Sequence, residues 1–333
     1  MTATASMLQI RDLTVQYNRG HRKPPLTALR DACLTIAPGE NVALVGESGS
    51  GKSTLGNAVL GLVPVTSGTI TFDGEDITHA STRRRRALTR DIQAVFQDPY
   101  GSLNPVRTIG STLAEPLLAH DKLDRAAIAA RVGAALDRVG LSADAAGMYP
   151  GQFSGGQRQR IAIARALMPS PRLIICDEPL SALDLSVQAQ VLNLLKGIQR
   201  DLSLSYLFIT HDLSVIPHIA HRVVVLYRGR VVETGPASQV CTRPGHPYTQ
   251  ALLSAAPVPD PVEQRARQRT RKPAGAGTRL PARGCVFAPR CPHAAAACTQ
   301  GEPTVFTTSG GGSVACSRYP ELTSHLTVPL GDR

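Results

Sequence analysis

A glycine-rich octapeptide reads Gly46-Glu47-Ser48-Gly49-Ser50-Gly51-Lys52-Ser53 and fits the pattern G-x-x-x-x-G-K-[ST]. An apolar run at residues 42–45 precedes it, and a plausible helix beginning at Thr54 follows it. In such a loop the glycines let backbone N–H groups and the helix N-terminus face an anion, while Lys52 reaches the outer phosphates and Ser53 binds magnesium. The stretch therefore predicts an α/β nucleotide-binding fold, and we call residues 46–53 the P-loop.

Apolar runs on both sides of the P-loop predict the surrounding sheets. Residues 8–17 alternate like a strand, and residues 31–36 and 41–45 flank a Pro38-Gly39 turn, which predicts an antiparallel hairpin entering the P-loop. Later runs do not alternate, as expected of parallel strands that helices cover on both faces. These runs are residues 173–176, 206–209 and 223–226.

Composition divides the chain into three parts. Alanine-rich helical sequence from about residue 113 to residue 167, with breaks at Gly140 and at residues 149–151, predicts a helical subdomain at about residues 106–168. This subdomain lies inside a nucleotide-binding domain at residues 1–256. Prolines then begin a linker at residues 257–283, and a C-terminal tail at residues 284–333 carries four of the seven cysteines.

Length, charge and hydropathy exclude several classes of protein. The first twelve residues lack the pattern of an export leader, and no apolar run in the 333 residues approaches the roughly 18 of a membrane span. We expect a chain that is neither secreted nor integral to a membrane. A net charge of +11 suits nucleic acid, but the arginine run at residues 83–86 has no interleaved aromatics and reads as a solvated face. We predict no nucleic-acid partner.

Four polar residues follow predicted strands. Asp177 and Glu178 are adjacent carboxylates, which a cation would stabilise, so we expect Asp177 to hold magnesium and Glu178 to orient or deprotonate the attacking water. Gln97 follows residues 92–96 and His211 follows residues 206–210, so both emerge at the sheet edge where nucleotides bind in α/β folds. Taken alone, each of these two is more typical of a structural polar group.

Between the P-loop and these carboxylates lies Phe153-Ser154-Gly155-Gly156-Gln157-Arg158-Gln159-Arg160, which opens a predicted helix at residues 157–167. Its start is an anion site separate from the P-loop. One nucleotide does not need both sites within one chain. At this point the sequence resembles the ATP-binding subunit of an ABC transporter, over roughly its first three quarters. Phe153 stands where that superfamily favours leucine, but the Ser-Gly-Gly-Gln core is intact.

We call residues 153–160 the signature element and the helix that they open the signature helix. The resemblance implies that ATP lies between two subunits, and that the signature helix of each subunit binds the γ-phosphate of the ATP held by the other. It also implies that Gln97 contacts magnesium, that His211 senses the γ-phosphate, and that residues 181–184 communicate between subunits. Tyr17 resembles the adenine-stacking aromatic, although a strand-face tyrosine is the alternative. The implied ATP contacts are Tyr17, residues 46–54, Ser154, Gly155, Gly156, Gln157 and Asp184.

Residues 95–105, 181–190 and 245–253 resemble a narrower branch, the oligopeptide/dipeptide/nickel importer ATPases. That resemblance implies a heterodimer with a related ATPase subunit, two integral-membrane permeases and, indirectly, an extracytoplasmic binding protein. It places the chain on the cytoplasmic face of the membrane. Import of nickel or another small solute stays open, as does a soluble ABC protein acting on nucleic acid or ribosomes. Soluble ABC proteins of that kind usually carry two ATPase cassettes in one chain or a long coiled-coil insertion, whereas this sequence has one cassette and neither addition.

The tail cysteines are the last candidate site. Residues 284–292 resemble the C-terminal motif of the same family, and the spacings between cysteines are looser than in common zinc modules. We expect a [4Fe-4S] cluster held by four thiolates, with zinc or unligated thiols as alternatives. The expected ligands are Cys285, Cys291, Cys298 and Cys316.

Overall fold

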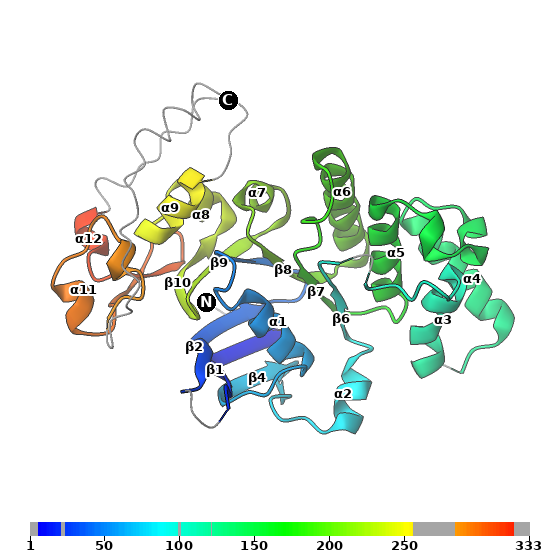
Figure 1. The fold of residues 1–333 in the computed structure, drawn as a ribbon, viewed down its shortest axis with the longest axis horizontal. Helices are drawn as coiled ribbons and strands as arrows, with labels where there is room; N and C mark the ends of the chain where they lie inside the picture. The colour runs from blue at the N-terminus through cyan, green and yellow to red at the C-terminus, as the bar shows by residue number, and fades with distance from the viewer. Residues whose placement is uncertain (1–5, 21–23, 99–100, 121, 256–283, 323–333) are drawn as a thin grey trace.

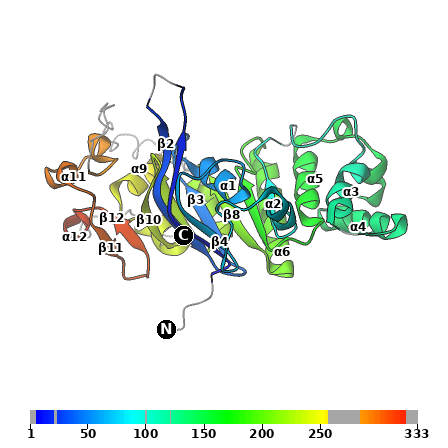
Figure 2. The ribbon, with the colours of Figure 1, turned by 90° about the horizontal axis from the view of Figure 1, so that it is seen from below.

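The structure, a computed structural model, describes residues 6–20, 24–98, 101–120, 122–255 and 284–322. Two sheets meet in the middle of the molecule, helices cover the larger one on both faces, and a helical lobe extends to one side (Figures 1 and 2). This arrangement confirms the expected α/β core with an antiparallel β subdomain and a helical subdomain. No helix among the described residues is long and apolar enough to span a bilayer.

The smaller sheet is antiparallel and carries the N-terminal strands in the order β2, β1, β4, β5. Its inner face packs on α1 (Lys52–Leu60), so Leu55, Ala58 and Val59 share one buried cluster with both sheets. Its strands are β1 (Leu8–Tyr17), β2 (Leu26–Ile36), β4 (Ser67–Phe72) and β5 (Glu75–Asp76).

The larger sheet has the order β11, β12, β10, β9, β3, β8, β7, β6 within the described residues, and its five strands from β9 to β6 are parallel. In β3 the residues point alternately into two different cores, Val42 and Leu44 into one and Ala43 and Val45 into the other. That double burial explains the unbroken apolar runs. The strands are β3 (Asn41–Val45), β6 (Ile92–Val95), β7 (Leu173–Asp177), β8 (Ser205–Thr210), β9 (Arg222–Tyr227), β10 (Arg230–Pro236), β11 (Val305–Thr307) and β12 (Ser313–Ala315).

The predicted hairpin before the P-loop is wrong. β2 pairs with β1 in the small sheet, whereas β3 pairs with β8 and β9 in the large one. The Pro38-Gly39 turn is real, but Gly39 donates its N–H to Ser205 Oγ (2.7 Å), which leads the chain away from β2. β3 is buried on both faces and β2 is not, so the two strands need different sheets.

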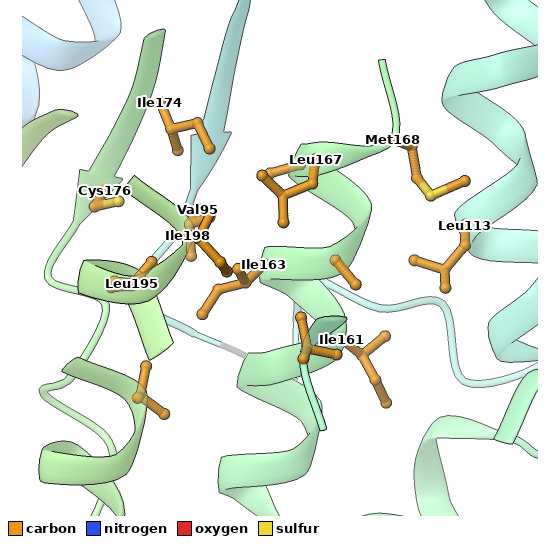
Figure 3. Close-up of a cluster of buried hydrophobic side chains, with 14 of the residues drawn as sticks. Val95, Leu113, Ile161, Ile163, Leu167, Met168, Ile174, Cys176, Leu195 and Ile198 are labelled. Carbon is orange, nitrogen blue, oxygen red and sulfur yellow. The ribbon is translucent and has the colours of Figure 1, made fainter. Parts of the chain in front are cut away.

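The helical lobe and the helix after β7 pack against β6, β7 and β8 in a further buried cluster, separate from the two that β3 enters. Figure 3 shows Ile163 and Leu167 reaching toward the sheet residues Val95 and Ile174, with Leu195 and Ile198 beside them. This packing fixes where the signature helix starts. The helices are α3 (Ile109–His120), α4 (Arg125–Arg138), α5 (Gly155–Leu167) and α6 (Leu185–Leu202).

The described part of the tail docks on the core sheet, because β12 pairs with β10 through Glu233 and Thr234. Phe287 of the tail is buried against Tyr227 and Tyr248. The predicted linker at residues 257–283 lies entirely outside the described residues. The remaining helices are α7 (Ile216–Ile219), α8 (Ala237–Thr242), α9 (Pro247–Ala255), α11 (Ala297–Gln300) and α12 (Tyr319–Leu322).

The arginine run lies in α2 (Thr82–Leu88) and is only partly a solvated face. Arg84 pairs with Glu75 at the surface. Arg85 instead turns inward and donates to the carbonyls of Val59 and Ile77. That arginine therefore satisfies one backbone acceptor at the end of α1 and another just after β5, which the composition of the run does not indicate.

Candidate active site

The P-loop joins the buried end of β3 to α1 and is held close to β9. Gly46 has φ 155° and Gly51 has φ 106°, both in the region that favours glycine. A Cβ at Gly46 would lie 2.1 Å from the carbonyl oxygen of Leu226. The glycines thus let the loop curl against β9, with the start of α1 facing outward as a site for an anion.

Lys52 is almost fully buried under the loop. Its Nζ donates to the carbonyl oxygens of Gly46 (2.8 Å) and Glu47 (3.1 Å). Burial lowers the pKa of the ammonium group, and the carboxylates of Glu178 and Asp177 partly offset that effect. The Lys52 ammonium group is therefore bound by carbonyl oxygens of the P-loop itself, at the place where phosphates would bind.

Ser53 and Asp177, the two residues predicted to bind magnesium in the P-loop and at the end of β7, are in contact. Ser53 Oγ donates to Asp177 Oδ1 at 3.1 Å, which joins the start of α1 to the end of β7. Burial raises the pKa of Asp177, while the Ser53 hydrogen bond lowers it. Hydroxyl and carboxylate oxygens are ligands that Mg²⁺ prefers, so these two residues fit a magnesium ion.

Glu178 and His211 also come together, from the ends of β7 and β8. His211 Nδ1 lies 3.1 Å from Glu178 Oε1. The Glu178 side chain is 14% exposed and that of His211 is 52% exposed, so the pair sits at the mouth of the site. Both border a cavity of about 90 Å³ together with Ser181 and Gln188. A carboxylate beside such a cavity is suited to general-base chemistry on water.

Two further residues of the predicted site make fewer described contacts, Tyr17 and Gln97. Tyr17 Oη donates to Thr54 Oγ1 at 3.4 Å, so the tyrosine lies beside the first turn of α1. Gln97 is exposed two residues beyond β6, whose Val95 pairs with Cys176 of β7. Among the described contacts, none joins Gln97 to Ser53 or Asp177.

The signature element begins α5 with a capping box. Ser154 Oγ accepts from the N–H of Gln157, and the Gln157 side chain accepts from the N–H of Ser154. Gly156 packs against Val187 so closely that a Cβ would lie 2.4 Å from its Cγ1. Asp184 caps α6, and hydrogen bonds from the Val187 N–H and the Ser186 hydroxyl lower its pKa.

The structure does not bring this element to the P-loop. α5 lies in the helical lobe, on the far side of β6 from α1 (Figure 1). Within the described residues, no hydrogen bond or ion pair joins Ser154, Gly155 or Gln157 to residues 46–54. The exposed Ser154 end of α5 has the free backbone N–H groups of a helix start, and no described hydrogen bond or ion pair joins it to the P-loop of the same chain.

The four tail cysteines line one cavity, together with His246 and Phe287. In the described part of the chain, no three His, Cys, Asp or Glu side chains are spaced to hold a single metal ion. The expected cysteine cluster is therefore not shown as a metal centre by the described residues, although its four thiols share one cavity.

A buried histidine borders the same cavity. His246 is 1% exposed, and its Nδ1 accepts from the Tyr248 N–H at 3.0 Å. Burial lowers its pKa to about 4, so the neutral ring carries its proton on Nε2. Among the described residues Nε2 has no partner. The unpaired donor belongs to a residue that lines the same cavity as the four cysteines, where a sulfur atom of a bound group would be an acceptor.

Two residues that touch the P-loop are absent from the predicted site. The N–H of Glu47 donates to Tyr248 Oη at 2.8 Å, and the Glu47 carboxylate pairs with Arg290. Both contacts bridge more than 200 residues of sequence. Tyr248 lies in residues 245–253 and Arg290 in residues 284–292, two stretches that resemble the importer family. That resemblance is the sequence feature from which a role for these two residues could have been predicted.

Comparisons with protein families give two matches. Residues 29–181 match the ABC transporter family, and residues 232–298 match the C-terminal region of oligopeptide/dipeptide transporters. The oligopeptide transport ATP-binding protein OppF of Salmonella typhimurium is 45% identical, over 95% of this chain and 97% of its own. A putative peptide import ATP-binding protein of Brucella ovis is 46% identical, over 96% of this chain and 99% of its own.

Solved structures agree. The ATP-binding cassette MJ0796, in a dimeric post-hydrolysis state bound to ADP and Pi, matches with a TM-score of 0.63 and 30% identity, over 69% of this chain and 99% of its own. CbiO1 of Clostridium perfringens, part of the ABC transporter complex cbiONQ, gives the same TM-score and identity over 71% of this chain and 90% of its own. The chain is therefore an ABC-type ATPase that belongs to the ATP-binding subunits of the oligopeptide/dipeptide branch of ABC transporters.

Proposed function

We propose that this chain is the ATP-hydrolysing subunit that powers import of peptides through an ABC transporter. The observation that carries the proposal is the similarity over at least 95% of the chain to proteins named for oligopeptide transport and peptide import. The convergence of Ser53, Asp177, Glu178 and His211 at one sheet edge supports hydrolysis as its activity.

In this proposal the P-loop binds the phosphates through its N–H groups, and Lys52 exchanges its loop carbonyls for phosphate oxygens. Ser53, Asp177 and Gln97 hold Mg²⁺, which neutralises phosphate charge when bound. Glu178 accepts a proton from the attacking water, and His211 orients Glu178 and contacts the γ-phosphate. Tyr17 stacks on adenine, next to Thr54.

Each complete site also needs a second subunit. Ser154, Gly155, Gly156 and Gln157 bind the γ-phosphate held by the partner ATPase, and Asp184 lies at the junction between the subunits. The support is that the α5 N-terminus is exposed and has no described contact with its own P-loop. The partner is a related ATPase, and the pair acts beneath two permeases on the cytoplasmic face of the membrane. An extracytoplasmic binding protein delivers the peptide.

We further propose that Cys285, Cys291, Cys298 and Cys316 hold a [4Fe-4S] cluster. The support is their position around one cavity that His246 also borders. Such a cluster supplies four iron–thiolate bonds that brace the tail, which has few buried residues of its own. Anaerobically purified chain is expected to contain iron and to absorb visible light, and Cys291→Ser is expected to reduce both. Chain without iron, or with zinc in its place, would exclude the cluster.

The transport role is tested by isolating the chain from membranes with its partners. Two permeases and a second ATPase should co-purify, and the reconstituted complex should accumulate labelled oligopeptide only with ATP. Lys52→Ala should abolish uptake, because the P-loop loses its phosphate-binding cation. Uptake of nickel instead of peptide, or recovery of ribosomes or DNA in place of permeases, would each exclude peptide import.

A further inference from the structure

The C-terminal tail reaches the nucleotide site at one residue, Glu47 of the P-loop. Three groups of Glu47 are held at once. Its N–H donates to Tyr248 Oη (2.8 Å), and its carbonyl oxygen accepts from Lys52 Nζ (3.1 Å). Its two carboxylate oxygens accept from Arg290 Nη1 (2.8 Å) and Nη2 (3.0 Å). Two of the three anchors therefore lie outside the P-loop.

Arg290 is well placed to act as a rigid anchor. Its guanidinium lies over the rings of Tyr227 and Phe287, 5.8 Å and 5.9 Å from their centroids, and donates to Tyr227 Oη at 3.3 Å. Those contacts fix the plane of the group, so it meets the carboxylate of Glu47 with two parallel hydrogen bonds. Arg290 directly precedes Cys291, which lines the cysteine cavity.

Tyr248 reaches the P-loop from α9, two residues after His246, which lines the cysteine cavity. Its ring is 1% exposed and packs on Tyr227 and Phe287, with centroids 4.4 Å and 5.4 Å away. Its backbone N–H bonds to His246, whose ring borders the cavity. Cys291 and His246 both line the cysteine cavity, and each is within two residues of a side chain that hydrogen-bonds to Glu47. Two short stretches of chain thus connect the walls of the cavity to the P-loop.

These anchors matter because Lys52 cannot serve both the loop and a nucleotide. When Lys52 moves to the phosphates, the carbonyls of Gly46 and Glu47 lose a donor. A loop that then relaxed would have to be ordered again on binding, which lowers affinity. Anchors that do not depend on Lys52 keep the loop in its receiving conformation.

We propose that Arg290 and Tyr248 are positioning residues that hold Glu47, so that the docked tail, through Arg290, and α9, through Tyr248, raise the affinity of the P-loop for ATP. Because coupling between sites is reciprocal, ATP also stabilises the docked tail. The inference goes beyond the transport role and depends only on ATP binding at the P-loop.

The test measures binding of Mg²⁺ and methylanthraniloyl-ATP to the full-length chain by fluorescence titration. Arg290→Ala and Tyr248→Phe should each weaken binding about fivefold, as expected for loss of one partly exposed polar contact. Arg290→Lys should recover part of the loss, since it keeps the charge but not the fork. In steady-state hydrolysis the KM for ATP should rise while kcat changes less than twofold.

The matched control is Glu302→Ala. Glu302 of the tail pairs with Arg230 of β10, so this variant also breaks an ion pair between tail and core, but away from the P-loop. Its ATP affinity should stay within twofold of the wild type. Two outcomes would overturn the inference. One is equal weakening of ATP binding in Glu302→Ala, which would assign the effect to tail docking in general. The other is unchanged ATP affinity in Arg290→Ala and Tyr248→Phe.

Failure of this inference is distinguishable from failure of the site assignment. If Lys52→Ala abolishes binding while Arg290→Ala and Tyr248→Phe bind normally, the P-loop binds ATP and only the positioning role is wrong. If Lys52→Ala also binds normally, the nucleotide site itself lies elsewhere. Thermal unfolding of each variant confirms that binding is compared between folded proteins.

Discussion

Glu178 combines an unusual backbone with a defined partner. Its φ of 48° lies in the left-handed region, which costs a non-glycine residue about 1–3 kcal/mol and is common at functional sites. Its N–H donates to the carbonyl of Ile209 (2.9 Å), and its carboxylate faces His211. The cross-strand bond thus maintains a conformation that aims the carboxylate at the cavity beside His211.

Replacing Glu178 by Gln tests the proposed general base. The amide keeps the shape but cannot accept a proton, so kcat should fall by about 10²–10⁴ while ATP binding is retained. Phosphate release and methylanthraniloyl-ATP titration measure the two quantities. Glu75→Gln, which alters only a surface pair with Arg84, is the control and should hydrolyse ATP normally. Unchanged turnover in Glu178→Gln would remove this residue from the chemistry.

At the scale of elements, the contact of α5 with α6 sets where the signature element sits. A Cβ at Gly156 would lie 2.4 Å from Val187, so Gly156→Ala must push the two helices apart. We expect a loss of about 1–3 kcal/mol in the free energy of unfolding. ATP-dependent association with the partner ATPase should weaken as well, because the N-terminus of α5 moves. Urea denaturation and size-exclusion chromatography with ATP measure the two effects.

Gly197 in α6 provides the matched control for this prediction. A Cβ there meets nothing within 4 Å, so Gly197→Ala introduces no clash. The substitution lowers the backbone entropy that the chain loses when it forms the helix. The free energy of unfolding should rise by up to about 1 kcal/mol. If both alanine variants destabilised the protein equally, close packing of α5 on α6 would not be the cause.

The turn between the two sheets carries a pH-dependent contact. Burial alone would raise the pKa of Glu40, but hydrogen bonds from Arg222 and from the Ala37 N–H lower it below its ordinary value of 4.5. The stabilisation is therefore complete above pH 4.5 and is lost as the pH falls through the lowered value. The free energy of unfolding should drop more steeply below pH 4.5 in wild type than in Glu40→Gln, as urea titrations at several pH values would measure. Equal slopes would contradict this.

The elements that the sequence predicts correctly are those with a local signal. Unbroken apolar runs identify β7, β8 and β9, since both faces of those strands are buried, and the glycine pattern identifies the P-loop. The hairpin between β2 and β3 fails because pairing partners 165 residues away, such as Tyr206 for Asn41, leave no local trace. The sequence also predicts that a helix start near Ser154 is separate from the P-loop, whereas the capping box that Ser154 forms with Gln157 is an observation of the structure.

On the scale of the whole molecule, the tail is packed into the same core as the nucleotide site. Phe287 is 1% exposed among Tyr227, Tyr248 and the strands of the large sheet. Phe287→Ala should lower the free energy of unfolding by about 3–5 kcal/mol, and denaturation should remain one transition. Val305→Ala, at a position 64% exposed on β11, should change it by less than about 0.5 kcal/mol. Two separate transitions would instead make the tail an independent unit.

The sequence predicts this level of organisation least well. It suggests that the four tail cysteines act together, and they do line one cavity. It gives no sign that Arg290 would pair with Glu47, 243 residues earlier, because an ion pair between exposed-looking residues has no periodicity. The division of the chain at residues 256 and 284 stays a prediction, as do the individual roles of the nucleotide-site residues.

The added strands of the tail have one more effect. β12 covers the outer margin of β10 at Glu233 and Thr234, and β11, with three residues, is the last strand on that side of the described sheet. Unpaired strand margins invite pairing with neighbouring chains, and a very short terminal strand reduces that hazard. Chains ending before residue 284 would bare β10, and they are expected to aggregate through it even where the nucleotide-binding fold itself forms.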